Sequence, residues 1–409
     1  MRPRSWIPPT GPQRVLVAAT FVNAVGRGAY LTAGVLYFTQ ALHLPAHQVG
    51  AALSVAGLLS LAAGPPSGHL ADRIGGRGLY IVTLLCGGLA TAAFVMATEF
   101  WGLLAAACAS ACASTAGLAA RGPLIAHHSP DRPQEFRGRL RSVSNIGISI
   151  GTLPAGWAVQ VGTRPAYVAL ILAAAATFLC AAAIVAFLPP TPPVPAHNGP
   201  RWIALRDIPY VTLTVLDGLM AVQFKVLTIA VPLWIVAATS APHWLISATM
   251  LVNTAIVGLF QARTARGVDT PAAAGRAMRR AGTTFLISCT MIALAAGMPP
   301  WAAAAMLLAG VVVHTVGELW HAAGGFELSF ALAPPHAIGQ YQGLFSMGMG
   351  GSEFVGPALV TALCIEWGQG GWIVLGIALA AVGLLVPPAA RLAGRRVAPA
   401  AESSLQAAR

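Results

Sequence analysis

The residues best suited to chemistry are ionisable side chains that interrupt long apolar runs. Such groups are costly in lipid and are usually functional there. We interpret six of them as candidates for a cavity that binds a substrate and protons: Arg27, Asp217, Lys225, Glu318, His321 and Glu353. For each acid, a static ion pair that only holds helices together is the alternative interpretation.

Four of these residues, Arg27, Lys225, Glu318 and Glu353, fall near the middle of their apolar runs. Two cations and two anions then share one layer, and buried charges should be paired. We therefore predict that Lys225 pairs with Glu318 and Arg27 with Glu353. Glu318 is the first candidate for a proton carrier and Glu353 the second.

His314, Glu318 and His321 recur at a spacing that places them on one helix face. A metal could bind such a face, but Gly317 stands where an HExxH motif would need histidine, so we expect no metal site. A proton-accepting cluster is favoured, because histidine titrates near neutral pH. A polar stripe along a water-filled cavity is the simpler alternative.

The composition decides which class of protein can position these groups. Of the 409 residues, 56% are hydrophobic and only 9% are charged, and mean hydropathy is +0.72. Soluble proteins carry about 25% charged residues, and disordered chains need low hydrophobicity. A membrane β-barrel would alternate apolar and polar residues. An all-α polytopic membrane protein remains.

The apolar runs have the length of membrane-spanning helices, about 20 residues. They predict twelve spans at 14–42, 46–71, 78–98, 101–126, 139–162, 165–188, 208–238, 243–264, 279–298, 301–333, 338–365 and 370–392. A Pro-rich cytoplasmic linker at 189–207 separates a six-helix half at 1–188 from a second at 208–409, which ends in a short tail. Equal halves suggest a repeat.

The net charge of +12 comes from arginines that gather in alternate loops and at both ends of the chain. Cytoplasmic loops carry such an excess, so both termini should be cytoplasmic. This pattern argues for a membrane and against nucleic acid as a partner.

The first apolar run is too long for a cleavable signal. The six Cys lie inside apolar runs and are expected to be packing residues.

One loop carries a sharp motif, from Gly68 through Asp72, Arg73 and Gly75 to Arg77. It resembles the signature G-x-L-A-D-R-x-G-x-R between the second and third helices of the major facilitator superfamily. The resemblance implies two six-helix halves that rock around a central site, with Asp72 helping to close the cytoplasmic side. Gly68 would allow close helix contact, and Asp72 should be attracted to the start of the 338–365 helix. Plain positive-inside topology is the alternative for the arginines.

A second signature, typical of drug exporters in this superfamily, is only partly present. Gly147 and Gly151 match it, but Pro154 comes late, and close helix packing also explains the two glycines. Arg121 either replaces an arginine of these exporters or extends to the membrane interface. Together with Gln340 to Gly343, this pattern resembles a group of actinobacterial exporters.

These observations predict a secondary transporter in the bacterial cytoplasmic membrane. No ATP-binding P-loop is present, so a proton gradient is the expected energy source, without a cofactor. We expect efflux of a small, partly apolar molecule by a monomer in the lipid bilayer. Uptake or facilitated diffusion is the alternative, and a multi-span membrane enzyme is a remote one, because no catalytic constellation is found.

Overall fold

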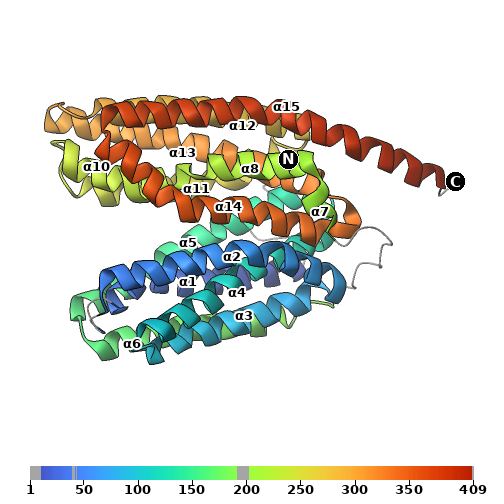
Figure 1. Cartoon of the computed structure of the whole chain (residues 1–409), viewed down its shortest axis with the longest axis horizontal. Helices are drawn as coiled ribbons and strands as arrows, with labels where there is room; N and C mark the ends of the chain where they lie inside the picture. The colour runs from blue at the N-terminus through green and yellow to red at the C-terminus, as the bar shows by residue number, and fades with distance from the viewer. Residues whose placement is uncertain (1–10, 39–41, 43, 191–201, 408–409) are drawn as a thin grey trace. The chain divides into compact units, whose positions relative to one another are not determined.

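The computed structural model describes residues 11–38, 42, 44–190 and 202–407, and for a few helical residues within these ranges only the backbone. The described residues form helices joined by short loops, with no strand among them (Figure 1). Most of the predicted linker, and residues 1–10 of the predicted first half, lie outside the described residues.

Two compact units divide the chain. Unit 1 contains residues 1–199 and 336–346, and unit 2 contains residues 200–335 and 347–409. The helix after residue 338 is therefore shared, because its first residues pack with unit 1 and the rest with unit 2. That the halves form a six-plus-six repeat stays a prediction.

Unit 1 is built from six long helices. They are α1 (Gly11–Leu36), α2 (Ala46–Ile74), α3 (Gly76–Ala93), α4 (Phe100–His128), α5 (Pro133–Val161) and α6 (Arg164–Val185), with the short 3-10 turn η2 (Phe94–Met96) after α3. Proline opens α5 and stands at the start of α6, where the missing amide hydrogen costs no helical bond. The predicted start of α5 at residue 139 was six residues late.

Unit 2 begins with a broken helix. The predicted span 208–238 consists of α8 (Ile208–Ala221), α9 (Gln223–Lys225), the π-helical turn η3 (Val226–Ala230) and α10 (Val231–Ala238), preceded by the short α7 (Ile203–Arg206). The backbone thus leaves α-helical geometry on both sides of the segment that contains Gln223 and Lys225, at Val222 and at η3. Such π-helical turns are often found at functional sites.

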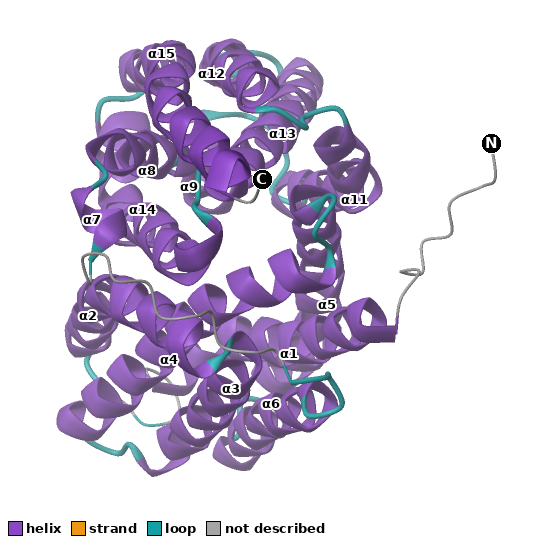
Figure 2. Cartoon of the chain, turned by 90° about the vertical axis from the view of Figure 1, so that its right-hand side faces the viewer, coloured by secondary structure: helices purple, strands orange, loops and turns teal. Residues whose placement is uncertain are grey.

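The remaining helices belong to unit 2, except that residues 336–346, in η4 and at the start of α14, belong to unit 1. They are α11 (Leu245–Arg266), α12 (Pro271–Leu294), α13 (Pro300–Ala331), α14 (Ile338–Val360), the π-helical η5 (Thr361–Glu366) and α15 (Gln369–Ala407), with the 3-10 turn η4 (Pro335–Ala337) before α14. The helices α12, α13 and α15 pack side by side (Figures 1 and 2). The predicted span 301–333 is one uninterrupted helix, whereas α12 begins eight residues before its predicted start and α15 extends beyond residue 392.

Nine helical segments among the described residues are long and apolar enough to cross a membrane. The helices α1, α5 and α12 are not among these nine, and each carries arginine within its length. Their position is set by packing instead. A Cβ atom at Gly151 of α5 would collide with the main chain of Val25 in α1, so the glycine permits close contact of the two helices.

Candidate functional site

A buried carboxylate–imidazole pair lies in unit 2. The Asp217 carboxylate of α8 is 3.2 Å from Nε2 of His321 on α13. Both residues are buried, with exposed fractions of 5% and 2%. The α8 and α13 helices therefore bring together two groups that lie 104 residues apart in sequence. Both were sequence candidates, although their pairing was not predicted.

Hydrogen bonds extend this pair into a chain across the unit. The side-chain amide nitrogen of Gln223 lies 3.5 Å from His321 Nδ1. The side-chain oxygen of Gln223, Oε1, lies 2.9 Å from His314 Nε2. On the far side of His314, Nδ1 lies 3.3 Å from the Ser288 hydroxyl. One continuous route of polar groups thus connects Asp217 to Ser288.

The donors along this chain are consistent with one arrangement of protons. The Gln223 amide nitrogen can only donate and its oxygen can only accept. His321 then accepts at Nδ1 and donates from Nε2 to Asp217, while His314 donates from Nε2 to Gln223. A neutral imidazole has one donor and one acceptor, so this assignment gives both nitrogens of His321 a partner. It also allows Nε2 of His314 to donate to the Gln223 main-chain carbonyl, 3.1 Å away. The tautomers follow from the bonding network.

Glu318 has different neighbours from those predicted. Its carboxylate accepts a hydrogen bond of 2.8 Å from the Asn253 side chain of α11, and Asn253 also donates to the Thr315 hydroxyl. Glu318 is 5% exposed. The predicted pair with Lys225 is wrong, because the Lys225 ammonium binds another carboxylate.

Lys225 forms its ion pair with Glu353 of α14, at 2.5 Å. The Glu353 side chain is 58% exposed and that of Lys225 is 14% exposed. Glu353, which was predicted to pair with Arg27, is bound by Lys225 instead. This pair lies within unit 2, whereas the proposal that the charges line a cavity between the halves stays a prediction.

The Asp72 motif lies in unit 1 at the beginning of α14. The Asp72 carboxylate accepts hydrogen bonds from the main-chain amides of Gly339, at 2.8 Å, and Gln340, at 3.0 Å. It is 6% exposed. The first amides of a helix have no partner within the helix and carry partial positive charge, so this carboxylate caps α14. A Cβ atom at Gly68 would collide with the Gly339 main chain.

The other residues of the motif have local roles. Gly75 joins α2 to α3 with φ of 87°, a conformation that glycine adopts without steric cost. The Arg77 guanidinium donates to the Ala186 carbonyl at 2.6 Å, beyond the end of α6. Arg73 is exposed. The motif therefore combines one carboxylate bound to main-chain amides with a tight turn and one arginine that holds a loop.

Side chains that were not among the predicted site residues also hold the start of α14. Arg137 of α5 donates to the Gln342 side chain at 2.5 Å, and Gln340 lies 3.0 Å from the His69 ring. In unit 2, Gln223, Asn253 and Ser288 were likewise not selected. Their common signal is a polar, uncharged side chain inside an apolar run, and amides in lipid-embedded helices find partners across helices.

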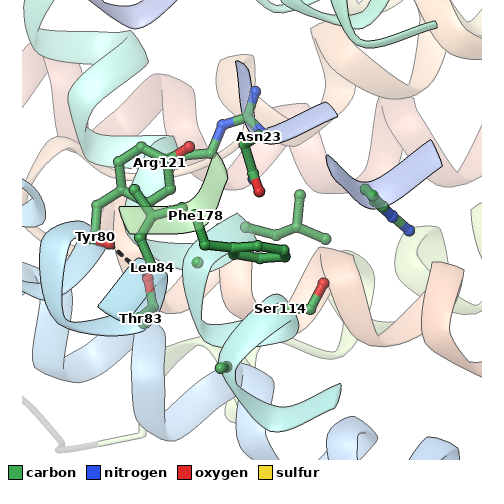
Figure 3. A pocket seen from close by; sticks show the side chains of 11 residues that line it. Asn23, Tyr80, Thr83, Leu84, Ser114, Arg121 and Phe178 are labelled. Carbon is green, nitrogen blue, oxygen red and sulfur yellow. Dashed lines mark hydrogen bonds between the residues drawn. The ribbon is translucent and has the colours of Figure 1, made fainter. Parts of the chain in front are cut away.

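Unit 1 contains a cavity of about 60 Å³ between α1, α3, α4 and α6. Figure 3 shows Asn23, Tyr80, Thr83, Ser114 and Arg121 around it. Arg121 does not extend away from the protein core. Its guanidinium lies 3.5 Å from the Thr20 hydroxyl and 6.0 Å from the centre of the Tyr80 ring. The other candidate arginine, Arg27, lines the same cavity.

Comparisons with known proteins agree with this architecture. The family model of the Major Facilitator Superfamily matches residues 16–317. No curated protein sequence matches the chain. Among solved structures, a bacterial homologue of the iron transporter ferroportin shares 16% identity at a TM-score of 0.72, covering 94% of this chain and 100% of that one.

Two further structures have the same fold. The major facilitator transporter FucP shares 13% identity at a TM-score of 0.71, covering 95% of this chain and 99% of that one. The human organic anion transporter MFSD10 shares 14% identity at a TM-score of 0.67, covering 92% of this chain and 100% of that one. At this level of identity the similarity concerns the fold.

Proposed function

Because this chain belongs to the major facilitator superfamily and is a multi-pass membrane transporter, we propose that it exports a small, partly apolar molecule in exchange for protons. The two halves alternate access to a central site. The protein acts as a monomer in the bacterial cytoplasmic membrane, with both termini cytoplasmic and no cofactor.

The buried pair of Asp217 and His321 is the observation that carries the proton coupling. A carboxylate in direct contact with an imidazole can share a proton with it, and histidine is the side chain that titrates near neutral pH. Desolvated ionisable groups are expensive in a membrane and are usually functional. The pair replaces Glu318 as the first candidate, because Lys225, the cation that was to control the charge of Glu318, binds Glu353.

Protonation of this pair has a consequence for Gln223. A protonated His321 donates from both ring nitrogens, so Nδ1 can no longer accept from the Gln223 amide nitrogen, 3.5 Å away. The amide must turn its oxygen toward His321, which takes that oxygen away from His314. His314 Nε2 then keeps only the Gln223 main-chain carbonyl, 3.1 Å away, as its acceptor. One proton thereby changes hydrogen bonds on α8, α9 and α13.

Asp72 supplies the second part of the proposed cycle. Its bonds to the Gly339 and Gln340 amides fix the first turn of α14 to the end of α2. We expect these bonds to form in the state closed to the cytoplasm and to break when that side opens. A helix-terminus interaction of this kind contributes roughly 0.3–2 kcal/mol, which is enough to shift a conformational equilibrium several-fold.

Transport in proteoliposomes with an imposed pH gradient tests the proposal. The lumen is made acidic, and accumulation of candidate drugs and natural products is followed in vesicles with and without a protonophore. Accumulation that requires the gradient and is lost in Asp217→Asn supports proton-coupled exchange. Equal equilibration with and without the gradient would favour facilitated diffusion, and accumulation only with an alkaline lumen would indicate uptake with protons.

A further inference from the structure

The cavity of unit 1 is unusual in its charge. Eleven residues line it, and they include Arg27 and Arg121 but no acid. Its walls also carry the apolar side chains of Leu84, Leu118 and Phe178. A positively charged, partly apolar pocket has thus formed inside a bundle of membrane-embedded helices.

Arg121 has no carboxylate partner among the described residues. Its contacts are the Thr20 hydroxyl at 3.5 Å, the upper limit for a hydrogen bond, and the Tyr80 ring. It lies about two turns before the end of α4. A guanidinium in this setting retains donors that can bind a planar anion through two parallel hydrogen bonds. The cation is therefore available to a ligand.

Two neutral polar groups beside Arg121 are also unsatisfied. The Tyr80 hydroxyl and the Asn23 side-chain oxygen are buried and have no hydrogen-bond partner, and Tyr80 is only 2% exposed. A buried polar group without a partner is destabilising, and a ligand that supplies the partner removes this penalty. Tyr80 can donate to an anionic oxygen, while Asn23 can accept from a hydroxyl on the same ligand.

We propose that this cavity binds the carboxylate end of the transported molecule, whose apolar body contacts Leu84, Leu118 and Phe178. The inference rests on the proposed function and names its substrate class, an organic anion with an aromatic or aliphatic body. The cavity volume of about 60 Å³ is several times the roughly 10–15 Å³ that one water molecule requires, so the cavity has room for a carboxylate group. The body of a drug-sized molecule therefore extends out of the pocket.

An anionic substrate also determines how the cycle moves charge. Export of a monovalent anion in exchange for one inward proton moves two positive charges inward, so an inside-negative membrane potential accelerates it. Uptake of the same anion together with one proton moves no net charge. The response to a potassium–valinomycin potential therefore distinguishes export from uptake once a carboxylate is transported.

Binding to the purified protein in detergent tests the inference without requiring transport. The probe is 3-hydroxybenzoate, and the uncharged control is 3-hydroxybenzamide. Thermal stability is measured over a millimolar concentration series with sodium chloride added to equal ionic strength. We expect 3-hydroxybenzoate to raise the unfolding temperature in a saturable way, because a ligand that binds the native state stabilises it. The amide should have no such effect.

Matched variants locate the site. Arg121→Gln should weaken 3-hydroxybenzoate binding at least tenfold and Tyr80→Phe about threefold. Arg279→Gln, at an exposed position of α12, should leave binding unchanged. Equal stabilisation by the amide, no stabilisation by either probe, or unchanged affinity in Arg121→Gln would overturn the inference. Proton coupling is measured separately, in the proteoliposome assay. If carboxylate binding fails, pH-driven transport of uncharged or cationic compounds can still be observed. If coupling fails, carboxylate binding in detergent can still be observed.

Discussion

Two polar sites of this transporter, one in each unit, differ in whether their buried polar groups have partners. In unit 2, Asp217, His321, Gln223 and His314 form a chain in which each ring and amide has a partner. In unit 1, the cavity around Arg121 leaves the Tyr80 hydroxyl and the Asn23 oxygen without one. A satisfied chain is suited to redistributing a proton internally, whereas an unsatisfied pocket is suited to a ligand from outside.

This comparison predicts the largest effect for Asp217→Asn. The amide cannot carry a proton or balance a charged imidazole, so pH-driven accumulation should fall more than tenfold. Exchange of substrate across the membrane should remain, because exchange requires no net proton movement. Accumulation and counterflow are measured in the same proteoliposomes. If accumulation is unaffected, the buried pair is structural and the comparison between the units fails.

The variant Glu318→Gln distinguishes two positions for the proton. Glu318 accepts from Asn253, and glutamine can still accept that hydrogen bond, so we expect a loss of pH-driven accumulation of less than threefold. The pH-driven accumulation of Glu318→Gln and of Asp217→Asn is measured in parallel. A complete loss in Glu318→Gln, with accumulation retained in Asp217→Asn, would move the proton site to Glu318, the residue that the sequence favoured.

Asp72→Asn should slow transport several-fold at normal expression. Asparagine offers one oxygen in place of two and has no charge, which removes roughly 0.3–2 kcal/mol of attraction to the α14 terminus. The initial rate of transport per purified protein is the measurement. Asp131→Asn is the matched control, because it makes the same chemical change at an exposed loop position before α5. A normal rate in Asp72→Asn would contradict the proposed gate.

The smallest effect is expected at the pair of Lys225 and Glu353. With the Glu353 side chain 58% exposed, the pair should contribute no more than about 0.2–1 kcal/mol. Glu353→Gln should therefore change the unfolding temperature by only a few degrees and leave pH-driven accumulation within twofold. A loss as large as that of Asp217→Asn would show that the exposed carboxylate takes part in coupling.

The fold could be predicted from the sequence because apolar runs of about 20 residues are a strong signal in membrane proteins. Each predicted span corresponds to a helical run, and the errors lie at the ends of α5, α12 and α15. The starts of α5 and α12 were predicted late because arginines in their first two turns were assigned to loops, although those turns are helical.

The partners of individual charges could not be predicted in the same way. Lys225 follows an interruption of the helix at Val222 and precedes the π-helical turn at Val226–Ala230. The depth of Lys225 in its apolar run, which was used to place it beside Glu318, does not determine the direction of the side chain next to such a break. The contact of Asp72 with the start of α14 could be predicted, because it requires only that the N-terminal end of a helix, which carries partial positive charge, lies near the carboxylate.

The contact at Asp72 has a consequence for how this protein can diverge in sequence. Both donors are main-chain amides, so the bond to residue 340 does not depend on which side chain stands there. Position 339 is restricted only by size, because a Cβ atom would collide with the Gly68 carbonyl and the Asp72 carboxylate. Paired substitutions, which report contacts between side chains, will therefore not reveal this one. In a family alignment it would be visible only as separate restrictions at positions 68, 72 and 339.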